Sequence, residues 1–217
     1  MELITSLHAL SGVIVGITGL LQILLKKGGK FHRTIGLLYC WAWLVVIITG
    51  TAIGSIFISL LGILGLYMVI TGYRFGHFKT SETKAIDKAI IYGGVVIAAL
   101  LLLSGPILYF IGRSQTLAII CFYFGAIFFI TTFQDLQVFV SKSRKKRTTG
   151  YKTEWYFEHF GRMYISYIAA ITAFSAIQNI FGIALVNWIS PTVIGTALIV
   201  FTNQKYYQKF KIPKRKS

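Results

Sequence analysis

Six ionisable side chains fall near the ends of apolar segments, where they could hold a metal, a haem or an anion. They are His32, Arg33, Arg74, Asp135, His159 and Arg162. Neutral imidazoles suit haem iron, zinc or copper, and a carboxylate adds an oxygen ligand or a proton acceptor. We therefore predict His32, His159 and Asp135 as candidate ligands. The arginines Arg33, Arg74 and Arg162 are predicted to bind an anionic substrate or haem propionates.

His8 is a further candidate ligand, predicted at the opposite depth of the membrane. On a helix it aligns with Gly12, Gly16 and Gly19, a stripe of small residues that lets a neighbouring helix approach closely. His8 either hydrogen-bonds across that contact or serves as a ligand or proton carrier, and both interpretations stay open. By contrast, His77 is expected in a solvated loop.

Asp135 is the only acidic residue inside any of the predicted spans. A carboxylate in hydrocarbon needs a partner or must stay protonated. Two hypotheses follow: an ion pair with one of the arginines at the same depth, or a site carboxylate beside His32 and His159.

These candidates interrupt a strongly apolar chain. Its 217 residues are 55% hydrophobic and 13% charged, and its mean hydropathy is +0.70. This composition is typical of an integral membrane protein, and we predict a single all-α domain over residues 1–217. The run 35–73 is too long for one span and is expected to turn at Gly50–Ser55. Seven spans are predicted, near residues 4–25, 35–52, 55–73, 88–111, 116–140, 160–182 and 187–204.

The basic residues predict an orientation, because lysine and arginine concentrate in short cytoplasmic loops. With seven spans, 21 of the 22 fall on one side and only Arg113 on the other. This pattern predicts an N-terminus outside, a C-terminus in the cytoplasm and a multi-pass location in the inner cell membrane. The first apolar run is preceded by Glu2 and by no lysine or arginine, unlike a cleaved signal peptide, so the first helix is expected to be retained. Cys40 and Cys121 then fall near opposite faces, so no disulfide is expected.

The net charge of +16 is explained by this orientation, so nucleic acid is not expected as a partner. Residues 141–162 and the tail 205–217 combine the positive charge with aromatic side chains. They are either ordinary inside loops with an aromatic belt or binding segments for anionic lipids.

Two motifs carry a family resemblance. The segments LHALSGVIVGITGLLQ and KFHRTIGLLY resemble the H-x-x-x-G…H-R-x-x-G-x-x-Y opening of a domain-of-unknown-function family of bacterial membrane proteins. HFGRMYISYIAAITAF, Arg74 and Asp135 resemble later features of the same family, which has no established activity. The His-Arg-x-x-Gly phrase also resembles membrane cytochromes of the b561 type. That resemblance implies one inner haem b held by His32 and His159, since the outer face offers only His8.

Three functions therefore remain open. The first is a membrane redox protein with haem or a divalent metal, the second a small-solute or proton-coupled transporter, and the third a scaffold for proteins or lipids. The sequence contains no GxSxG, HExxH or GxxxxGK[ST] motif, which sets aside the enzyme classes that use them. It assigns no enzyme class, substrate or oligomeric state.

Overall fold

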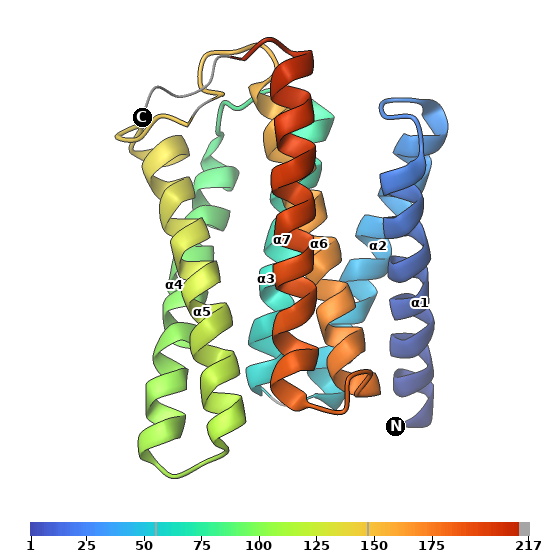
Figure 1. The fold of residues 1–217 in the computed structure, drawn as a ribbon, viewed down its shortest axis with the longest axis vertical. Coiled ribbons are helices and arrows are strands. Elements are labelled where there is room, and N and C mark those ends of the chain that lie inside the picture. The colour runs from blue at the N-terminus through green and yellow to red at the C-terminus, as the bar shows by residue number, and fades with distance from the viewer. Residues whose placement is uncertain (55, 147, 213–217) are drawn as a thin grey trace.

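Seven α-helices and a short π-helix pack side by side in the computed structural model (Figure 1), which describes residues 1–54, 56–146 and 148–212. Within these residues there is no strand. The helices are α1 (Glu2–Leu24), α2 (Lys30–Ile53), α3 (Ile56–Phe78), α4 (Ala85–Phe110), α5 (Gln115–Asp135), η1 (Leu136–Val140), α6 (Glu154–Gln178) and α7 (Ala184–Lys209).

Six of these segments are long and apolar enough to cross a membrane: α1, α2, α4, α5 with η1, α6 and α7. Each has 23 to 26 residues, more than the roughly 20 that a bilayer core requires. α3 matches them in length with 23 residues. The chain is therefore a multi-pass helical membrane protein, as its composition predicts.

The helices extend beyond several of the predicted spans. α2 begins at Lys30, and α3 continues to Phe78, so His77 lies in the last turn of a helix and not in a loop. Hydropathy marks only the apolar part of a helix, whereas the backbone hydrogen bonds continue into its polar end turns. At the predicted turn, α2 runs to Ile53 and Gly54 is extended. Ser55 lies outside the described residues.

Glycine permits a close backbone contact between α4 and α5. A β-carbon at Gly125 would lie 2.5 Å from the backbone of Leu102, so only glycine allows this approach. α1 pairs with α2, and α6 lies between α3 and α7 (Figure 1). Both cysteines are free.

The helices alternate in direction, and this places the most basic segments at one end of the bundle, the upper end in Figure 1. The segments 26–33, 74–88, 142–162 and 205–216 contain 21 of the 22 lysines and arginines. We call this end, as far as it is described, the basic end. The N-terminus lies at the opposite end (Figure 1).

Candidate functional site: a buried ion-pair network

Arg162 of α6 is the centre of a polar network at the basic end. Only 5% of it is exposed. Its Nη1 and Nη2 donate to the two carboxylate oxygens of Asp135 at 2.8 and 2.7 Å. Nε and Nη2 donate to Glu158 at 3.3 and 3.1 Å, and Nη1 donates to the Thr71 hydroxyl at 3.0 Å. All five guanidinium N–H groups are thus engaged, which lets the cation be buried.

Asp135, at the end of α5, is 1% exposed. Besides the two bonds from Arg162, it accepts a hydrogen bond of 2.7 Å from the hydroxyl of Tyr67. The hypothesis of an ion pair with an arginine is confirmed, and Arg162 is the partner. A metal site built from His32, His159 and Asp135 is not supported, because both oxygens of Asp135 are already engaged. Among the described residues, no three His, Cys, Asp or Glu side chains lie together as metal ligands would.

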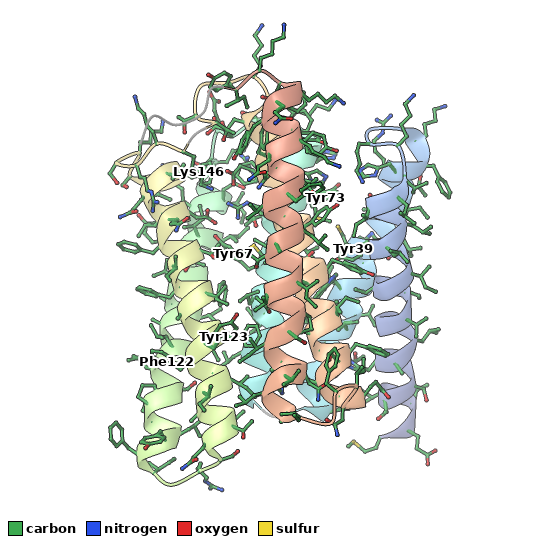
Figure 2. The ribbon with its side chains drawn as sticks, in the orientation of Figure 1. Tyr39, Tyr67, Tyr73, Phe122, Tyr123 and Lys146 are labelled. Atoms are coloured by element: carbon green, nitrogen blue, oxygen red, sulfur yellow. The ribbon has the colours of Figure 1, made fainter. Side chains whose placement is uncertain are left out.

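Lys146 closes the network from the loop between η1 and α6. Its ammonium lies 2.9 and 3.0 Å from the two oxygens of Glu158 and 3.9 Å from Asp135. Figure 2 shows Lys146 near the basic end and Tyr67 deeper in the bundle. Alone among these residues, Lys146 is on a loop, so it can leave without moving a helix.

A second ion pair lies beside the first. Nε of Arg74 on α3 is 2.6 Å from Asp87 on α4, and Asp87 also accepts a bond of 2.6 Å from the backbone N–H of Lys84. The ring of Phe75 contacts both guanidinium groups, with its centroid 5.3 Å from Arg74 and 4.9 Å from Arg162. Such contacts are favourable cation–π interactions.

Together these side chains form what we call the ion-pair network: Tyr67, Thr71, Arg74, Asp87, Asp135, Lys146, Glu158 and Arg162. It contains three cations and three carboxylates, so its formal charge is zero. Four helices, α3 to α6, contribute to it. They enclose a cavity of about 10 Å³ lined by both ion pairs, which is about the space that one water molecule needs.

The backbone changes its hydrogen-bonding pattern at Asp135. α5 ends there and continues as the π-helix η1, in which the N–H of Ser141 donates to the carbonyl of Leu136 at 2.9 Å. π-helical turns occur frequently at functional sites. This turn places the buried ring of Phe139 5.8 Å from the guanidinium of Arg162 and 5.1 Å from the ammonium of Lys146. The aromatic ring thus shields the network from water.

The two candidate histidines at the basic end lie outside this network. Nδ1 of His159 is 2.8 Å from the carbonyl oxygen of Gly72, which makes it the donor. Nδ1 of His32 is buried and has no hydrogen-bond partner among the described residues. Lys27, in the preceding loop, donates to the carbonyls of Gln22 and Ile23 at the end of α1. Burial lowers the pKa of the Lys27 ammonium.

The remaining candidates are dispersed. Arg33 is exposed on the first turn of α2. Nδ1 of His8 lies 3.0 Å from the hydroxyl of Thr49, so His8 hydrogen-bonds from α1 to α2. The small-residue stripe does not pack as predicted: a β-carbon at Gly12 or Gly16 would meet nothing within 4 Å. At Gly19 it would lie 2.2 Å from the Tyr167 ring, so close packing is confined to that end of the stripe.

Several members of the network were not predicted from the sequence. Asp87 and Glu158 lie inside α4 and α6, so Asp135 is not the only acidic residue in the membrane-length helices. Glu158 could have been found, because it precedes Arg162 by four residues, the spacing of neighbours on one helix face. No periodic signal marks Tyr67 as a partner of Asp135 or Lys146 as a partner of Glu158.

The fold and the site define a multi-pass helical membrane protein with a neutral, buried cluster of charges at one end. Comparison with known proteins adds no relative: no family model, no curated protein and no solved structure matches the chain. The family resemblance of its motifs stays a prediction.

Proposed function

We propose that this protein is a small-solute or proton-coupled transporter of the cell membrane. It has seven spans, with the N-terminus outside and the basic end in the cytoplasm, and the ion-pair network is its closed cytoplasmic gate. The observation that carries the proposal is the burial of Arg162 and three carboxylates where four helices meet, with the partly buried Arg74 paired to one of these carboxylates.

A purely structural role explains this arrangement poorly. Ionisable groups are costly inside a membrane and usually mark a pathway for ions or substrates. A buried ion pair also contributes little net stability, because apolar residues of similar volume often stabilise a fold as well or better. Net stability therefore gives little reason to keep these charges in place of apolar residues such as leucine and methionine.

The position of the network suits a gate. The pair Arg162–Asp135 joins α6 to α5, and the pair Arg74–Asp87 joins α3 to α4. Separation of the α4–α5 pair from α3 and α6 breaks both ion pairs at once and admits water to the cavity between them. The released carboxylates can then take up protons, and the released guanidinium groups suit a solute that carries a carboxylate or phosphate.

The test is proton flux into liposomes that contain the purified protein and a trapped pH-sensitive dye, driven by a potassium diffusion potential. The key variant is Tyr67→Phe/Asp135→Leu/Arg162→Met, which removes the central ion pair without leaving an unpaired partner. We expect it to keep its thermal unfolding midpoint within a few degrees and to lose the flux. Arg113→Gln, at the opposite end, is the matched control and should keep the flux.

Two results would overturn the proposal. One is a triple variant that conducts as well as the unmodified protein. The other is an unmodified protein whose proton flux is no greater than that of protein-free liposomes. This result would have to hold both with the potential alone and after addition of each member of a panel of candidate solutes: small carboxylates, phosphates, amines and sugars.

A membrane redox function is a second candidate, favoured by one observation: the buried and unpartnered Nδ1 of His32. His32 and His159 would be the ligands of a haem or metal, without Asp135. The absorption spectrum and metal content of the protein in mild detergent test it. A Soret band or bound metal that disappears in His32→Ala and in His159→Ala would support this function. Colourless, metal-free protein would reject it.

A further inference from the structure

We infer that the basic end binds the headgroups of anionic phospholipids, and that it does so chiefly at one patch between α6 and α7. This α6–α7 patch consists of Tyr156 and Tyr164 on α6, Lys205, Tyr206 and Lys209 on α7, and Phe210 directly after α7. The buried ring of Phe160 packs against the rings of this patch. The inference is independent of the transport proposal, since it concerns the outer surface of the bundle and not the ion-pair network.

The first observation is an imbalance between exposed cations and exposed acids. Among the described residues of the basic end, thirteen lysines and arginines are exposed, but Glu82 is the one exposed acid. The other acidic residues of this end are all buried: Asp87, Asp135, Glu154 and Glu158. The surface is therefore positive with almost no local compensation.

The orientation explains the cations at this end, but it does not explain why so few exposed acids accompany them. The preference of lysine and arginine for the cytoplasmic side is not a rule of net charge, and acidic residues contribute little to it. Exposed acids could therefore accompany the cations without disturbing the orientation. A surface that keeps its acids inside is instead complementary to an anionic leaflet, whose potential attracts basic segments near the membrane.

The second observation is the aromatic cluster that forms the α6–α7 patch. The ring of Tyr156 lies 5.2 Å from that of Tyr206 and 5.6 Å from that of Phe210. The ring of Phe160 lies 5.5 Å from that of Tyr206. All of these distances are within the range of favourable ring pairs. Tyrosine rings of this kind are enriched at the level of the lipid headgroups, where one edge is apolar and the other is wet.

Two lysines complete the patch. Lys205 and Lys209 are exposed on α7 and are four residues apart, so they lie on one face of the helix. Their ammonium groups lie over aromatic rings, 4.4 Å from the centroid of Phe201 and 6.0 Å from that of Tyr206. In the described part of the chain, neither lysine forms an ion pair with a carboxylate. Lys209 lies over the ring cluster, and Lys205 lies over the ring of Phe201, one turn earlier on α7. The two ammonium groups fit a phosphate whose glycerol and acyl chains lie along these rings.

Tryptophan fluorescence can locate the lipid. Trp155 lies in the first turn of α6 at the basic end, and Trp188 lies in the first turns of α7 at the opposite end. Two single-tryptophan proteins, each made by tryptophan→phenylalanine substitutions elsewhere, report on the two ends separately. Each is reconstituted into phosphatidylcholine that contains either brominated phosphatidylglycerol or brominated phosphatidylcholine. The ratio of the two quenching curves gives the relative affinity for the anionic lipid.

We expect Trp155 to be quenched preferentially by phosphatidylglycerol and Trp188 to show no preference. Each lysine near an anionic surface contributes about fivefold in affinity. Lys205→Gln/Lys209→Gln should therefore remove most of the preference, and about 0.5 M salt should weaken it by screening. Lys26→Gln/Lys30→Gln, at the same end but on the loop before α2 and its first turn, is the matched control and should keep it.

Three results would overturn the inference. Equal quenching of Trp155 by the two lipids would show no anionic preference at the basic end. An equal preference at Trp188 would show that the basic end is not the site. A preference that survives the loss of Lys205 and Lys209 would exclude the α6–α7 patch. The thermal unfolding midpoint of each variant confirms that the comparison is between folded proteins.

Discussion

The ion pair between Asp135 and Arg162 can be tested by a double-mutant cycle on stability. The cycle starts from Tyr67→Phe, so that the tyrosine hydroxyl is not left without its acceptor when Asp135 is replaced. Onto this parent we place Asp135→Leu, Arg162→Met and both together. The structure predicts that each single substitution is strongly destabilising and that the combination is nearly neutral.

The magnitudes follow from what each substitution leaves behind. Breaking a buried ion pair by removal of one partner costs about 3 to 5 kcal/mol. The loss of stability in Asp135→Leu should be about 3 kcal/mol, because Arg162 keeps its hydrogen bonds to Glu158 and Thr71. The loss of stability in Arg162→Met should be about 5 kcal/mol, because the one cation left near Asp135 is the ammonium of Lys146, 3.9 Å away. Replacement of both partners by apolar residues should fall within about 1 kcal/mol of the parent.

The assay is thermal unfolding in detergent, followed by tryptophan fluorescence. For a chain of this size, each kcal/mol shifts the midpoint by about 2 to 4 °C. The single variants should therefore unfold about 6 to 20 °C below the parent, and the double variant should unfold within a few degrees of it. Additive effects, with the double variant the least stable, would refute the claim that these two side chains form one buried pair.

Three further predictions concern other parts of the molecule. Lys146→Ala should lower the free energy of unfolding by only about 1 kcal/mol, because the ammonium is partly exposed, but it should increase proton flux in liposomes. Lys145→Ala, at the exposed neighbouring position, should change neither the stability nor the flux. Gly125→Val should prevent α4 and α5 from pairing, since even a β-carbon would collide with the α4 backbone, and the folded yield after detergent extraction should fall sharply; Gly12→Ala, where nothing lies within 4 Å, should fold normally. Asn187→Leu should destabilise by about 2 to 3 kcal/mol, because this buried amide accepts hydrogen bonds from Phe181 and Ser175 at the corner between α6 and α7; an unfolding midpoint equal to that of the unmodified protein would contradict this role.

Much of the architecture could be predicted from the sequence. Long apolar runs predict membrane helices, and each of the seven predicted spans overlaps a helix, six of them long and apolar enough to cross a membrane. The clustering of basic residues predicts one basic end, because helices joined by short loops must alternate in direction. An ion pair for Asp135 was also predictable, since a buried carboxylate needs a partner. These features depend on local composition, which a single sequence records directly.

The partner of Asp135 was not predictable. Arg33, Arg74 and Arg162 lie at the same predicted depth, and the choice among them depends on the rotation of each helix about its own axis. That rotation is set by packing between segments far apart in the chain. Asp87 was missed for a simpler reason: the predicted span began at residue 88, whereas α4 begins at Ala85. A span predicted from hydropathy ends at the first polar residues, and the network is built from those residues, so they fall outside the predicted span.

The position of the network along the chain has a consequence for biogenesis. During synthesis, Arg74 can pair with Asp87 as soon as α4 has followed α3. Asp135 is made before its partner Arg162, which is 27 residues further along the chain. At about 5 to 20 residues per second, that interval is roughly 1 to 5 s of synthesis. During it, Tyr67 of α3 is already available to donate to the carboxylate. Tyr67 can therefore bind Asp135 before Arg162 is available. This hydrogen bond would hold the end of α5 near α3 until α6 brings Arg162 to the carboxylate.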